Sequence, residues 1–86
     1  MKYKITIEEK ALKHITYFQK HDKDLVKKIK DLFEDMKRDP FDGIGKPEPL
    51  KFELTVFWSR RITREHRVVY KVVGSEILVL SCRYHY

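Results

Sequence analysis

The segment that most constrains the fold lies in the C-terminal half, where two strand-like runs flank a short polar stretch. Phe57–Ile62 and Val68–Val73 are rich in aromatic and β-branched side chains, and Thr63–Glu65 lies between them. This pattern is typical of a β-hairpin. Four arginines fall within eight residues of the segment: Arg60, Arg61, Arg64 and Arg67. A hairpin holds such planar, permanently charged groups on a stiff sheet, which suits phosphate or carboxylate partners. The alternative is a solvated charged face.

The length of the hairpin loop decides whether the arginines meet, because alternate residues of a strand face opposite sides of a sheet. A loop with an odd number of residues, such as Thr63–Glu65, places Arg61 opposite Arg67 on one face. An even loop places them on opposite faces. We expect the odd loop, because only this arrangement leaves one apolar face for helices to cover: Trp58, Ile62, Val68, Tyr70 and Val72.

The N-terminal half predicts a short strand followed by two helices. Tyr3–Ile7 alternates with β-branched side chains, as in a strand. Thr6 and Glu9 match a capping box, with Thr6 as the N-cap of the first helix. Asp22 is expected to cap the second helix, which ends before Pro40. An antiparallel pair of helices with one apolar seam then packs on a sheet. The seam residues are Ala11, Leu12, Ile15 and Phe18 in the first helix and Leu25, Val26, Ile29, Leu32, Phe33 and Met36 in the second.

Two further strands are expected around the hairpin. Lys51–Val56 is expected to enter the sheet before it, and Glu76–Tyr84 to follow it after a two-residue turn at Gly74-Ser75. In the last strand, the side chains expected to face the helices are Leu78, Leu80, Cys82 and Tyr84. Those expected to face Arg61 and Arg67 are Ile77, Val79, Ser81, Arg83 and His85. The predicted fold class is α+β, with two N-terminal helices packed on a twisted, mainly antiparallel sheet of about five strands.

The loop Pro40–Leu50 holds a carboxylate on a stiff support. It contains two of the three glycines and all three prolines of the chain. Glu48 lies between Pro47 and Pro49, whose rings restrict the backbone to an extended conformation. Lys46 and Lys51 flank it. A glutamate in a loop is often only solvent-exposed, but this one is rigidly held.

Composition narrows the classes of protein. The chain has 86 residues and a net charge of +6, so we expect a single domain (1–86) with an acidic partner such as nucleic acid. One cysteine excludes an internal disulfide, and the spacing of the four histidines predicts no metal site. We expect no cofactor. The N-terminus has no signal-peptide pattern and no apolar run approaches the roughly 20 residues needed to span a bilayer. A cytoplasmic protein without membrane contact is therefore expected.

The expected arrangement brings Glu48, His85, Arg61 and Arg67 around one site. An acid, a histidine and two arginines at one phosphate can cleave RNA without a metal. A base removes the 2′-hydroxyl proton, arginines stabilise the charge on the phosphorus oxygens, and an acid protonates the leaving 5′-oxygen. Taken alone, His85 is equally consistent with a surface histidine close to the end of the sequence.

Three ordered motifs carry a family resemblance. KPEPLK (46–51), FWSRRIT.EHR.VY (57–70) and CRYHY (82–86) resemble the YoeB/Txe toxins of bacterial type II toxin–antitoxin modules, which belong to the RelE superfamily. The resemblance implies a microbial-ribonuclease-like fold and cleavage of mRNA in the ribosomal A site. It also implies neutralisation by a YefM/Axe-like antitoxin, and a possible homodimer.

The resemblance also assigns roles to matching residues. It implies that Glu48 is the general base, His85 the general acid and Arg67 the phosphate-stabilising arginine. Lys51 and Arg61 match residues that assist charge and positioning, and Tyr86 matches the aromatic residue that helps place the substrate. Arg60 and Arg64 are expected as flanking charges, available to ribosomal RNA or solvent.

Two other functions fit the same scaffold. A toxin similar to the ParE-type gyrase poisons shares the fold without the acid–base residues, and would damage DNA without cutting RNA. A basic RNA-binding module would bind RNA in a salt-dependent way without cleaving it.

Overall fold

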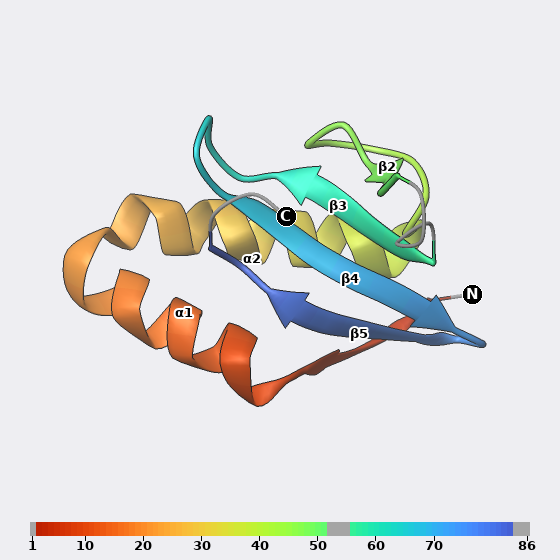
Figure 1. Ribbon diagram of the computed structural model, residues 1–86, viewed down its shortest axis with the longest axis horizontal. Helices are drawn as coiled ribbons and strands as arrows, with labels where there is room; N and C mark the ends of the chain where they lie inside the picture. The colour runs from red at the N-terminus through yellow and green to blue at the C-terminus, as the bar shows by residue number, and fades with distance from the viewer. Residues whose placement is uncertain (1, 52–55, 84–86) are drawn as a thin grey trace.

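The protein is a two-layer α+β domain in which two helices cover one face of a five-stranded sheet (Figure 1). The computed structural model describes residues 2–51 and 56–83. The strands lie in the order β1-β5-β4-β3-β2, and only the β1–β5 pair is parallel. The predicted fold class is confirmed.

The helices are α1 (Glu9–His21) and α2 (Lys23–Arg38). Asp22 caps α2 as predicted, since its Oδ1 accepts a hydrogen bond of 3.2 Å from Leu25 N. The expected apolar face of α2 is buried or half-buried along its length. On α1, however, Leu12 is 53% exposed and does not belong to the core.

The predicted capping box at the start of α1 is wrong. Thr6 lies in β1 (Lys4–Ile7), and the N-cap is Glu8, which makes no capping hydrogen bond with its side chain. Parallel pairing of β1 with β5 (Glu76–Ser81) keeps the chain extended through Ile7. Thr6 Oγ1 instead donates to Glu76 Oε2 on the neighbouring strand, at 2.6 Å.

The hairpin consists of β3 (Phe57–Arg61) and β4 (Arg67–Val73), and its loop has an odd number of residues, as expected. Arg61 therefore pairs directly with Arg67, and Ser59 with Val69. The opposite face packs against the helices and carries the predicted apolar side chains: Trp58, Ile62, Val68, Tyr70 and Val72.

A β-bulge reverses part of the predicted facing of β5. Tyr70 pairs with Val79 but Val69 pairs with Ser81, so Leu80 is the extra residue between the two pairs. Before the bulge, Ile77 and Val79 face the helices, each 0% exposed, whereas Leu78 and Leu80 are only half-buried. The sequence predicts the opposite, with Leu78 and Leu80 facing the helices and Ile77 and Val79 facing away. After the bulge, the buried Cys82 joins the core as predicted, and Ser81 lies on the other face. Tyr84 lies outside the described residues.

Most of the strand expected at Lys51–Val56 lies outside the described residues, and an edge strand that was not expected precedes it. The edge strand β2 is Glu48–Pro49, and neither Lys51 nor Val56 is in a strand; residues 52–55 lie outside the described part of the chain. Glu48 pairs with Ser59 and Pro49 with Trp58. The proline-flanked glutamate is thus part of the sheet itself.

Candidate active site

Strand register brings Glu48, Arg61 and Arg67 to the sheet face that points away from the helices. Residues that pair across neighbouring strands share a face, so Glu48 lies with Ser59. Arg61 lies two residues further along β3 on the same face, and Arg67 of β4 pairs with it. We call this the arginine face, defined by Glu48, Ser59, Arg61, Arg67, Val69 and Ser81. Ser59, Val69 and Ser81 are nearly fully buried across its middle, and Glu48 and Arg61 are exposed. Sequence reasoning had predicted this convergence.

The two arginines of this face suit an anion. Directly opposite residues in an antiparallel pair have Cβ atoms about 5 Å apart, so like charges there repel. An anionic oxygen between Arg61 and Arg67 removes that repulsion and gains charge-assisted hydrogen bonds. Glu48 is on the diagonal from Arg61, at a Cβ separation of about 7–8 Å, which long side chains can span. The face therefore presents a carboxylate beside two arginines.

The end of the hairpin is held by its own turn. Thr63 Oγ1 accepts from Glu65 N and His66 N, both at 3.2 Å, and Ile62 N donates to His66 O at 2.9 Å. The His66 ring packs against Phe18 of α1, with ring centroids 5.1 Å apart. These contacts fix the backbone just before Arg67, the first residue of β4, which lies at the hairpin-turn end of the arginine face.

The other predicted site residues are Lys51, His85 and Tyr86. Lys51 is exposed. It comes directly after Leu50, whose backbone N donates a hydrogen bond to Phe57 O at 2.9 Å. His85 and Tyr86 lie outside the described residues, so their roles stay predictions. The chain that leads to them is held by α1, because Cys82 N donates to His14 Nδ1 at 3.1 Å. Arg83 does not face the arginines as expected, since its guanidinium lies 4.0 Å from the ring centroid of Tyr17 on α1.

A basic groove continues from the arginine face toward α2. Its volume is 370 Å³ and its cationic lining residues are Lys28, Lys46 and Arg61. Lys46 adopts a left-handed backbone conformation, with φ of 51°. Asp31 also lines the groove, so its charge is mixed. Lys28 reaches the groove from α2 and is exposed.

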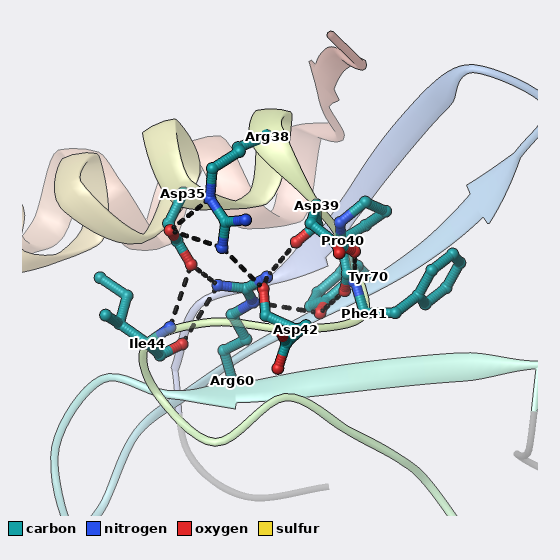
Figure 2. Close-up of polar contacts among 9 residues, drawn as sticks. All are labelled: Asp35, Arg38, Asp39, Pro40, Phe41, Asp42, Ile44, Arg60 and Tyr70. Atoms are coloured by element: carbon teal, nitrogen blue, oxygen red, sulfur yellow. Dashed lines mark hydrogen bonds and ion pairs between the residues drawn. The ribbon is translucent and has the colours of Figure 1, made fainter. Parts of the chain in front are cut away.

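Arg60 is not the exposed flanking charge that the sequence indicated. Its side chain is fully buried, on the side of β3 that faces the helices, and forms an ion pair with Asp35 of α2 at 2.6 Å (Figure 2). Alternation could have identified it, because Arg60 lies between Trp58 and Ile62, which were both predicted to face inward. An arginine at an inward position predicts a buried partner. Sequence reasoning missed Arg60, Asp35 and the hydroxyl of Tyr70.

Two titratable groups near the described end of the chain are held neutral. Burial raises the pKa of the Cys82 thiol to about 12, so Cys82 does not supply a nucleophilic thiolate at neutral pH. Burial, with smaller contributions from the charges of Lys10 and Arg83, lowers the pKa of His14 below its usual 6.5. A neutral His14 keeps Nδ1 free to accept from the Cys82 amide.

Neither helix in 2–51 and 56–83 is long and apolar enough to cross a membrane. Within the same ranges, no three His, Cys, Asp or Glu side chains are grouped so that they could hold a metal ion.

A small basic α+β protein with a carboxylate and a pair of arginines on one sheet face is the class that fold and site define. The family model described as the YoeB-like toxin of bacterial type II toxin–antitoxin systems matches residues 7–86. The toxin YoeB of Escherichia coli K12 is 52% identical over 83 residues, covering 96% of this chain and 99% of that protein. The chain belongs to the YoeB-like toxin family.

Solved structures agree with this assignment. The YoeB dimer from Staphylococcus aureus is 46% identical, with a TM-score of 0.90 and full coverage of both chains. A chain of the heterotetrameric YoeB–YefM toxin–antitoxin complex from the same organism is 46% identical, with a TM-score of 0.86 and full coverage of both. The RelE/YoeB-like fold predicted from the sequence is thus confirmed.

Proposed function

We propose that this toxin is a metal-independent endoribonuclease that cleaves mRNA in the ribosomal A site and thereby inhibits translation. The observation that carries the proposal is the register of β2, β3 and β4, which puts Glu48 on the same face as Arg61 and Arg67. Membership of a toxin family supports it. The proposed substrate implies that the protein acts in the cytoplasm.

The proposed reaction uses the RNA's own 2′-hydroxyl as nucleophile. Glu48 removes the proton from this hydroxyl, and the 2′-oxygen attacks the adjacent phosphorus. Arg67, assisted by Arg61, stabilises the negative charge that builds on the non-bridging oxygens. His85 donates a proton to the departing 5′-oxygen. The products are a 2′,3′-cyclic phosphate end, which becomes a 3′-phosphate when water hydrolyses it, and a new 5′-hydroxyl end.

Positioning of the RNA is assigned to groups around this centre. Lys51, two residues after β2, contributes charge, and Tyr86 helps to place the substrate. Such contacts count because an aligned reaction gains much of its rate from orientation. No metal ion or cofactor is needed, since the base, the acid and the charge stabilisation all come from side chains.

We propose two protein partners. One solved relative is a YoeB–YefM heterotetramer, which supports a YefM/Axe-like antitoxin as the partner that neutralises this chain. Another is a YoeB dimer, which supports a homodimer. The net charge of +6 favours association with the ribosome, whose RNA is polyanionic.

The test is primer extension on mRNA in a translating extract. The wild type is expected to produce cuts that map to the A site and leave 5′-hydroxyl ends. Glu48→Gln, Arg67→Ala and His85→Ala are each expected to lower cleavage by at least about 100-fold while remaining folded by circular dichroism. The same variants are expected to relieve growth arrest.

Other outcomes identify the alternatives. DNA damage without RNA cuts would indicate a gyrase poison. Salt-dependent RNA binding with no cleavage on ribosomes would indicate an RNA-binding module. Full activity of folded Arg67→Ala and His85→Ala would contradict the assigned roles.

A further inference from the structure

The loop between α2 and β2, residues 39–47, contains neither helix nor strand and folds around the guanidinium of Arg60 (Figure 2). Its backbone oxygens point inward to this group from Asp39, Asp42 and Ile44. A loop in this position normally satisfies its carbonyls with water. Here a buried cation from β3 does so, and the loop conformation depends on it.

Every N–H of the Arg60 guanidinium has an acceptor. Nε donates to Tyr70 Oη at 3.3 Å. Nη1 donates to Asp35 Oδ2 at 2.6 Å and to Ile44 O at 3.1 Å. Nη2 donates to Asp39 O at 2.5 Å and to Asp42 O at 3.1 Å. These five bonds exhaust the donors of an arginine. A lysine has three donors and no planar fork, so it cannot reproduce this set.

Asp35 and Tyr70 bind both Arg60 and the loop, and we call Arg60, these two side chains and the loop oxygens around the guanidinium the cage. Asp35 Oδ2 also accepts from Ile44 N at 3.0 Å, so one carboxylate holds both the cation and the loop. Tyr70 Oη donates to Pro40 O at 2.6 Å. The Phe41 ring packs on Trp58, with centroids 4.9 Å apart. Side chains from α2, β3 and β4 thus hold the loop in place through contacts between residues 39 and 44.

The position of Glu48 depends on these loop contacts, because β2 has few hydrogen bonds of its own to hold it. β2 has two residues, and Pro47 and Pro49 on either side of Glu48 have no N–H to donate to a ladder. The loop exit is tied to β3, since Arg61 N donates to Gly45 O at 2.7 Å. The residue that makes this bond directly follows Arg60. The cage and the Arg61–Gly45 hydrogen bond therefore fix the chain at Gly45, three residues before Glu48.

We propose that Arg60, together with Asp35 and Tyr70, is a positioning residue for Glu48. It sets the path of the loop so that the Glu48 carboxylate meets the arginine face at the distance that proton transfer requires. Arg60 itself touches no substrate, because it is fully buried on the opposite side of the sheet. The catalytic part of this inference rests on the proposed role of Glu48 as the base.

The kinetic test uses Tyr70→Phe and Arg60→Met, each alone and combined with Glu48→Gln. The measurement is single-turnover cleavage of mRNA on programmed ribosomes, over a range of toxin concentrations. Each variant is expected to lower the maximal rate by about 10- to 100-fold, because misplacement of about 1 Å costs rate of this order. The half-saturating concentration is expected to stay within about twofold, as for a change that spares ground-state binding.

The combined variants separate positioning from general damage. In the Glu48→Gln background, adding Tyr70→Phe is expected to lower the rate by less than about threefold, because the group it positions is already absent. Ile77→Val, a core variant far from the loop, controls for stability. It is expected to lose thermal stability while keeping the wild-type maximal rate. Equal fractional losses in both backgrounds, or a similar rate loss in Ile77→Val, would overturn the positioning role.

A measurement that needs no cleavage separates this inference from the proposed function. Amide hydrogen exchange of the full-length protein reports whether β2 loosens. In Tyr70→Phe, the Leu50 amide, which bonds Phe57 O, is expected to exchange at least about 10-fold faster. The Asp22 amide, which bonds Phe18 O at the N-terminal end of α2, the end farther from the loop, is expected to be unchanged. Unchanged exchange at Leu50 would refute the link between cage and β2, whether or not the protein cleaves RNA.

Discussion

Replacing Asp35 by asparagine should destabilise the protein more than any other single charge removal on α2. Asparagine keeps an oxygen that can accept from Arg60 but removes the negative charge. The Arg60 side chain is 0% exposed, so it would be left without a counterion. Removing one partner of a buried ion pair costs about 3–5 kcal/mol. Because Asp35 is 19% exposed and four other acceptors of Arg60 remain, we expect a smaller loss than this, about 2–3 kcal/mol.

The assay is equilibrium unfolding in urea followed by tryptophan fluorescence. Trp58 is the single tryptophan and touches Phe41 of the caged loop, so its emission reports on this region. Asp31→Asn, an exposed acid on the same helix, is the matched control and should lie within about 0.5 kcal/mol of wild type. A similarly small change for Asp35→Asn would refute the view that the cage needs this charge.

The same variant carries a pH signature. Burial raises the pKa of Asp35, but hydrogen bonds from Arg60, the Ile44 amide and Arg38 outweigh this effect, so the net pKa lies below its usual 3.8. A depressed folded-state pKa gives stability that is complete above the unfolded-state value and is lost as the pH falls through the folded-state value. The stability difference between wild type and Asp35→Asn should therefore be constant at neutral pH and shrink below about pH 4. A difference that persists unchanged at pH 2 would contradict this cause.

Two further predictions concern β5 and the segment that follows it. Ile77→Ala should cost about 2–5 kcal/mol and Leu78→Ala at most about 1.5 kcal/mol, because Ile77 faces the helices and Leu78 does not; urea unfolding measures both, and the reverse order would restore the facing expected without the bulge. The Cys82 thiol should react with Ellman's reagent at pH 8 at least about 100-fold faster in unfolding concentrations of urea than in the native state, because burial raises its pKa to about 12. Equal rates would show that the thiol is not protected.

Much of the fold was predictable because its signals are local. The apolar period of α2, the Asp22 cap and the turn at Gly74-Ser75 each depend on neighbours within a few residues, and each agrees with the structure. The capping box at Thr6 fails because a strand distant in the sequence, β5, pairs with β1 and keeps it extended. The facing of Ile77 and Leu78 fails because a bulge breaks strict alternation.

The candidate site shows the same division. The pairing of Arg61 with Arg67 followed from requiring one apolar hairpin face, which is a constraint the sequence carries. Sequence reasoning located Glu48 but placed it in a loop before the sheet, because two prolines conceal a two-residue edge strand. Arg60 was misjudged because an arginine in a charged run is usually solvated.

The sequence alone determined the fold class, the hairpin with its arginine pair and the membership of a toxin family, because hydrophobic period, turn chemistry and ordered motifs are written in neighbouring residues. Only the tertiary structure decided which arginine is buried and which lies on the arginine face. Arg60 and Arg61 are adjacent and chemically identical, yet a strand sends them to opposite faces. On one face lies Asp35 and a loop that needs donors, and on the other lies Glu48 and Arg67. The burial of a charge depends on partners that are 25 residues away in the chain and adjacent in the fold.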